Sequence, residues 1–162
     1  MTRCVRSCST GWTGSRSWRE QAERLAGSGV VALAVEDTSA QSVAEAAGYL
    51  KEERGVRDVT LIGASAGTAG VLGAAEDPGL ADGVILLSGT GDVSGLGVYP
   101  KLFVASEGEG LAGEVRSMAE EAPGSRNEAL ILPGDAHAQA IFASDQGEKL
   151  MRAILERLEG NG

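Results

Sequence analysis

Apolar and polar positions along the chain form two kinds of segment that alternate. The first kind is a short, almost wholly apolar run, which is typical of a strand buried on both faces of a sheet. The second kind is longer and places apolar residues at helical spacing along one side. The predicted strands cover residues 30–35, 58–62, 84–88, 102–105 and 129–132. The predicted helices cover residues 18–26, 39–53, 66–75, 110–121 and 145–158.

Strands that alternate with helices predict an α/β fold: one domain over residues 1–162, with a mostly parallel sheet of about six strands and helices on both faces. Residues 1–9 are too polar for a buried central strand, so we expect a ragged edge strand or partial disorder there. The connection 89–101 is rich in glycine and has no helical period. A loop of that length without regular structure is often functional or mobile.

Composition narrows the classes of partner. The net charge of −9 argues against nucleic acid, whose binding depends on clustered Lys and Arg. No run approaches the ~20 apolar residues of a membrane span, and the N-terminus lacks the apolar centre of a signal peptide, so we expect a cytoplasmic protein. Cys4 and Cys8 are then expected to be free thiols. With a single histidine and no phosphate-binding glycine loop, no metal or other cofactor is predicted.

The candidate chemistry begins with Gly63-Ala64-Ser65-Ala66-Gly67, a G-x-S-x-G sequence between a predicted strand and a predicted helix. In a nucleophile elbow the serine adopts a strained backbone conformation, which requires very small neighbours on both sides. Glycine and alanine provide that clearance here. Ser65 is therefore the candidate nucleophile, and Ala66, which follows it at a helix N-terminus, can present a backbone N–H to an oxyanion.

A serine hydroxyl needs a base within hydrogen-bond reach. His137, the single histidine, follows the strand 129–132 and so falls at the carboxyl edge of the sheet, where open α/β sheets gather their sites. Three acids could orient it. Glu107 and Glu109 follow the strand 102–105, and Asp92 follows the strand 84–88.

These motifs resemble those of the α/β-hydrolases, over about residues 8 to 158. Members of that family place the nucleophile, the acid and the histidine in this chain order, usually with the acid a few residues beyond the corresponding strand, which favours Glu109. The segment Thr10-Gly11-Trp12-Thr13-Gly14-Ser15 looks like the family's His-Gly-x-x-Gly loop with Thr in place of His. By that match Trp12 donates the second oxyanion N–H.

Two departures from the family pattern imply a minimal, lidless member: the chain has no room for the antiparallel strands that usually come first, and the loop 89–101 stands where a cap is often inserted. Such a member is similar to small bacterial esterases and the dienelactone-hydrolase-like group. We therefore predict a serine esterase that cleaves small or short-chain carboxylic esters, with Ser65, His137 and Glu109 as its triad. The alternatives are a degenerate scaffold or binding protein on the same fold, and a thioesterase or acyltransferase on the same residues. A homodimer formed through an exposed sheet edge is a further hypothesis.

Overall fold

The structure is a computed structural model that describes residues 2–7 and 18–160. Six segments form strands: β1 Thr2–Ser7, β2 Ala32–Val35, β3 Asp58–Ala64, β4 Gly83–Leu87, β5 Lys101–Ser106 and β6 Asn127–Leu132. Five form α-helices: α1 Arg19–Gly27, α2 Ala40–Glu52, α3 Gly67–Ala75, α4 Ala112–Glu121 and α5 Gly147–Glu159. Two short 3₁₀ helices, Glu107–Glu109 and Ala138–Ala143, follow β5 and β6.

The strands make one sheet in the order β2-β1-β3-β4-β5-β6, and every neighbouring pair is parallel. The predicted α/β class with a parallel sheet is thus confirmed. Because all strands run the same way, the segments that follow them emerge at one edge of the sheet. That edge gathers the chemistry described below.

The prediction of an edge strand at the N-terminus was wrong. β1 pairs with β2 on one side and with β3 on the other, so it lies inside the sheet. The chain passes through α1 to the outer strand β2 and returns through α2 to β3. Strand order follows these crossovers and the pairing of backbone groups, and a polar sequence does not prevent either.

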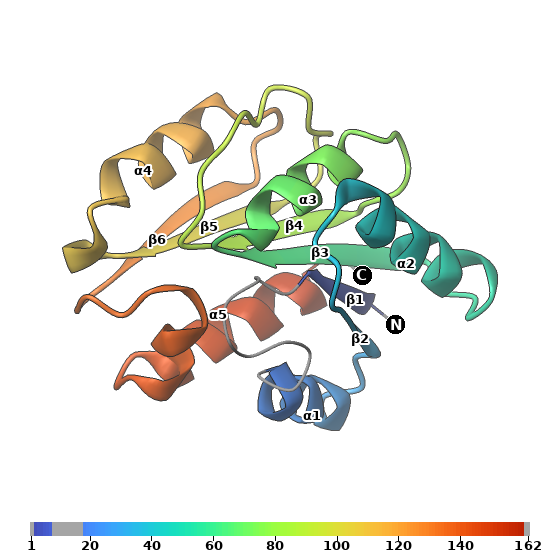
Figure 1. Ribbon diagram of the computed structural model, residues 1–162, viewed down its shortest axis with the longest axis horizontal. Helices are drawn as coiled ribbons and strands as arrows, with labels where there is room; N and C mark the ends of the chain where they lie inside the picture. Colours follow the sequence, from blue (N-terminus) through green and yellow to red (C-terminus); the bar gives the residue numbers. More distant parts are fainter. Residues whose placement is uncertain (1, 8–17, 161–162) are drawn as a thin grey trace.

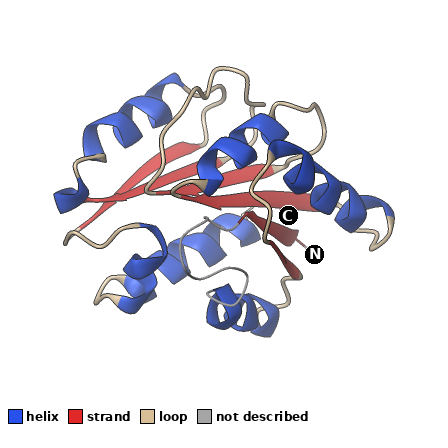
Figure 2. Cartoon of the chain, viewed as in Figure 1, coloured by secondary structure: helices blue, strands red, loops and turns tan. Residues whose placement is uncertain are grey.

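Helices cover both faces of the sheet, as predicted (Figures 1 and 2). On one face, Leu61 and Leu86 belong to a buried core with α2, α3 and α4. On the other face, Ile62 and Ile85 belong to a second core with α1, α5 and the 3₁₀ segment after β6. Adjacent residues of β3 thus serve opposite cores, since successive side chains of a strand point to opposite faces.

The glycine-rich connection between β4 and β5 packs against the core. Val93 and Leu96 are buried in the same cluster as α3, and the Tyr99 hydroxyl donates to the Ala75 carbonyl at 3.0 Å. The connection is therefore held down beside α3 through these buried side chains.

Candidate active site

The candidate nucleophile lies in the sharp turn between β3 and α3. Ser65 has φ of +49°, in the left-handed region that a residue with a side chain rarely adopts. Its N–H donates to the Leu87 carbonyl of β4 at 2.9 Å, and its carbonyl accepts from the Thr68 N–H at 3.0 Å. A Cβ added at Gly63 would lie 3.1 Å from Val71 Cγ2 and from a backbone oxygen of α3, a tight contact that glycine avoids. The local geometry is that of a nucleophile elbow.

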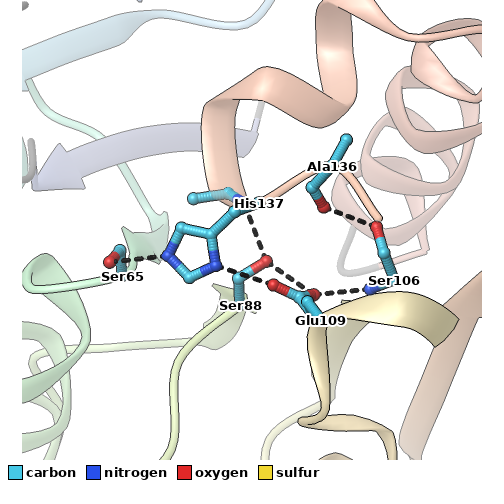
Figure 3. Close-up of polar contacts among 7 residues, drawn as sticks. Ser65, Ser88, Ser106, Glu109, Ala136 and His137 are labelled. Atoms are coloured by element: carbon cyan, nitrogen blue, oxygen red, sulfur yellow. Dashed lines mark hydrogen bonds and ion pairs between the residues drawn. The ribbon is translucent and has the colours of Figure 1, made fainter. Parts of the chain in front are cut away.

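His137 comes from the other side of the site, in the loop after β6, where it stands directly before the 3₁₀ helix Ala138–Ala143. Its Nε2 lies 2.9 Å from Ser65 Oγ (Figure 3). The two residues are 72 positions apart in sequence. The parallel sheet brings them together because β3 and β6 both end at this edge.

Among the three candidate acids, the structure brings Glu109 to the histidine. Glu109 Oε2 lies 2.7 Å from His137 Nδ1, and the Glu109 side chain is 5% exposed against 52% for His137. Glu107 is exposed. Asp92 is exposed as well, and hydrogen bonds from the Ser94 side chain and from the Ser94 N–H lower the pKa of Asp92. A buried carboxylate, a half-exposed imidazole and a serine hydroxyl thus form one continuous chain of hydrogen bonds.

Two further residues of the site were missed from the sequence. Ser88 follows β4, and its hydroxyl donates to Glu109 Oε1 at 2.9 Å. Ser106 ends β5, and its N–H donates to the same oxygen at 2.5 Å (Figure 3). A signal was available, because each is a polar residue at the carboxyl end of an apolar strand and both are buried.

Of the two predicted oxyanion donors, Ala66 lies among the described residues. Ala66 stands at the N-cap of α3, and the backbone N–H groups at the start of a helix have no partner within the helix. Trp12, the other predicted donor, lies outside the described residues, as does Cys8. No group of three or more His, Cys, Asp or Glu suited to a metal occurs in the described part of the chain. None of the helices described combines the length and apolarity that a bilayer crossing requires.

Solved structures with the same architecture cover nearly the whole chain. A monoacylglycerol lipase from Paleococcus ferrophilus superposes with a TM-score of 0.76 at 16% identity, over 98% of this chain and 95% of that one. The fold is that of the α/β-hydrolases. A metagenome-derived lipolytic enzyme gives 0.72 at 15% identity over 98% and 93% of the two chains. An esterase from Exiguobacterium antarcticum gives 0.69 at 10% identity over 97% and 92%.

The α/β-hydrolase resemblance read from the sequence is thus confirmed at the level of fold. No protein-family model and no curated protein matches this sequence. At identities of 10–16%, structural likeness establishes the architecture alone. The activity therefore has to be argued from the side chains of the site.

Proposed function

We propose that this protein is a serine hydrolase that cleaves small or short-chain carboxylic esters through an acyl-enzyme. The observation that carries the proposal is the pair of contacts at His137, with Nε2 2.9 Å from Ser65 Oγ and Nδ1 2.7 Å from Glu109 Oε2. A nucleophile, a base and a group that orients the base are the three parts that acyl transfer to serine requires.

In the proposed reaction Ser65 Oγ attacks the acyl carbon while His137 Nε2 accepts the hydroxyl proton. The tetrahedral intermediate then collapses, and the imidazolium gives that proton to the oxygen of the leaving alcohol. Water attacks the acyl-serine with the same histidine as base, which releases the acid and restores Ser65. Throughout, Glu109 accepts a hydrogen bond from His137 Nδ1–H and so keeps Nε2 free to take the proton.

The oxyanion would be held by backbone donors. The Ala66 N–H supplies one, assisted by the partial positive charge at the N-terminus of α3. We propose the Trp12 N–H as the second, on the strength of the sequence match alone.

Two observations support a small acyl group. The His137 side chain is half-exposed, which makes the site open to water. The connection between β4 and β5, where many α/β-hydrolases insert a cap, buries Val93 and Leu96 in the core. An open site gives a long acyl chain little apolar surface to bind.

The test is hydrolysis of p-nitrophenyl acetate, butyrate and octanoate by the wild type and Ser65→Ala, together with labelling by a fluorophosphonate probe. We expect turnover that falls with chain length, a loss of more than about 10³-fold in Ser65→Ala, and labelling of the wild type alone. Equal, negligible rates and no labelling would contradict the proposal and favour a catalytically inactive scaffold. Faster release of p-nitrophenol when an alcohol is added would indicate acyl transfer on the same residues.

A further inference from the structure

Strained backbone in the described part of the chain is concentrated around the proposed triad. Three residues other than glycine have positive φ there: Ser65 at +49°, Ser88 at +50° and Ala138 at +51°. Ser65 is the proposed nucleophile, Ala138 follows His137 directly, and Ser88 has no part in the proposed reaction. Such conformations are energetically unfavourable for residues with a side chain and persist where the surroundings enforce them. The unfavourable backbone conformation of Ser88 therefore suggests that its position serves a function.

Ser88 joins the acid to the backbone of the histidine loop. It lies at the end of β4 with 2% of its surface exposed, and its own N–H donates to the Val104 carbonyl at 2.8 Å. Its hydroxyl is 2.9 Å from Glu109 Oε1 and 2.7 Å from the Ala138 nitrogen. Since a backbone N–H can only donate, the hydroxyl accepts from Ala138 and gives its single proton to Glu109. Both partners fix the direction of the O–H bond.

Ser106 holds the other side of the same loop. Its hydroxyl donates to the Ala136 carbonyl at 2.6 Å, and its N–H donates to Glu109 Oε1 at 2.5 Å. The peptide groups on both sides of His137 are therefore each bound by a buried serine hydroxyl, as Figure 3 shows. The two serines also supply both donors to Oε1, which leaves Oε2 facing His137 Nδ1.

We propose that Ser88 is a positioning residue for the hydrolysis proposed above, on which this inference rests. Its hydroxyl orients the Glu109 carboxylate and ties down the peptide that follows His137. The half-exposed His137 imidazole is then held in place by its fixed backbone and by the hydrogen bond to Glu109. Ser88 is too deeply buried to touch a substrate, so its effect passes through Glu109 and His137.

The first variant is Ser88→Ala, which keeps the Cβ and the backbone conformation and removes only the hydroxyl. We expect kcat to fall about 10- to 100-fold with KM changed less than twofold, because misplacement of a catalytic group by about an ångström costs a factor of this order. The matched control is Ser144→Ala. Ser144 also donates one hydrogen bond, to the Ile141 carbonyl at 2.7 Å, and accepts one, from the Gln146 N–H at 3.1 Å, and neither partner belongs to the proposed triad.

The decisive readout is a double-mutant cycle with Glu109→Gln. If Ser88 acts in part through Glu109, the loss of activity caused by Ser88→Ala will be at least about threefold smaller in the Glu109→Gln background than in the wild type, because only the bond to the Ala138 N–H then remains to be lost. A purely structural role would lower activity by the same factor in both backgrounds, which would overturn the inference. The rate of fluorophosphonate labelling, compared across the same four proteins, gives the cycle without a natural substrate.

The outcomes separate the two proposals. A wild type that neither hydrolyses esters nor reacts with the probe would remove the proposed function. An active wild type with Ser88→Ala inside twofold of it would overturn the positioning role alone. If Ser88→Ala does not fold, Ser88→Gly replaces it, since glycine relieves the strain at φ +50° and also lacks the hydroxyl. Full activity in folded Ser88→Gly would likewise overturn the role.

Discussion

Replacing Glu109 by glutamine tests the geometry of the site more sharply than any truncation. The carboxamide has the same shape as the carboxylate, but one of its two terminal atoms is a donor. Oε1 accepts from the Ser88 hydroxyl and the Ser106 N–H, and the backbone donor of Ser106 cannot reverse. The oxygen of the glutamine must therefore take the Oε1 position, which turns its NH₂ group toward His137.

That NH₂ group would force the wrong tautomer on the histidine. With a donor at 2.7 Å, Nδ1 has to be the unprotonated nitrogen, so the ring proton moves to Nε2. Nε2 then faces Ser65 Oγ at 2.9 Å with a proton of its own and cannot accept another. The corresponding acid-to-amide change in serine proteases lowers kcat by about 10⁴-fold, or about 5 kcal/mol, and we expect a loss of this size here.

The assay is steady-state hydrolysis of p-nitrophenyl butyrate, with kcat and KM determined separately. Glu107→Gln is the control. It removes the same charge from an exposed residue two positions before Glu109, so its kcat should stay within about twofold of the wild type. A loss of less than tenfold in Glu109→Gln, or an equal loss in both variants, would refute the assignment of Glu109 as the orienting acid.

Two predictions concern stability. Burial lowers the pKa of Lys101 from 10.5 to about 8, so the unfolded chain binds more protons between those values and stability rises with pH there. Between pH 7.5 and 9.5 the free energy of unfolding in urea should rise by about 2 kcal/mol more in the wild type than in Lys101→Met. An equal change with pH in the two proteins would contradict this. Gly70→Ala would push a Cβ into the Thr38 carbonyl and should cost about 3 kcal/mol, whereas Gly48→Ala, with open space around it, should gain up to about 1 kcal/mol. Equal melting temperatures would refute that contrast.

The wholly apolar runs were the most informative part of the sequence. Residues 84–88 and 102–105 were predicted as strands, and they form β4 and β5 inside the sheet. The central residues of a strand that is covered on both faces are mostly apolar, so a short apolar run in the sequence predicts such a strand.

The position of β1 is the opposite case. Nothing in Thr2–Ser7 distinguishes an interior strand from an edge strand, because its neighbours β2 and β3 are chosen by crossovers that involve α1 and α2. Strands pair through backbone groups, so the pattern of polar and apolar side chains did not predict the position of β1 in the sheet.

The acid shows the same division on a smaller scale. Glu107 and Glu109 lie in one 3₁₀ helix, where side chains advance by a third of a turn per residue and so face different directions. A local signal did favour Glu109: Ser106 with Glu109 forms an S-x-x-E capping pair, in which the carboxylate reaches back to the Ser106 N–H. Its second oxygen reaches His137 only because β5 and β6 are neighbours.

By itself, then, the sequence determined the α/β class, the elbow at Ser65 and the histidine at the carboxyl edge of the sheet. Each of these depends on residues close together in the chain, whose periodicity and small size decide the local backbone. The tertiary structure decided the place of β1, the choice of Glu109 and the linkage of Ser88 and Ser106 to the histidine loop. These depend on which strands become neighbours, and strand order arises from packing between segments that are distant in sequence.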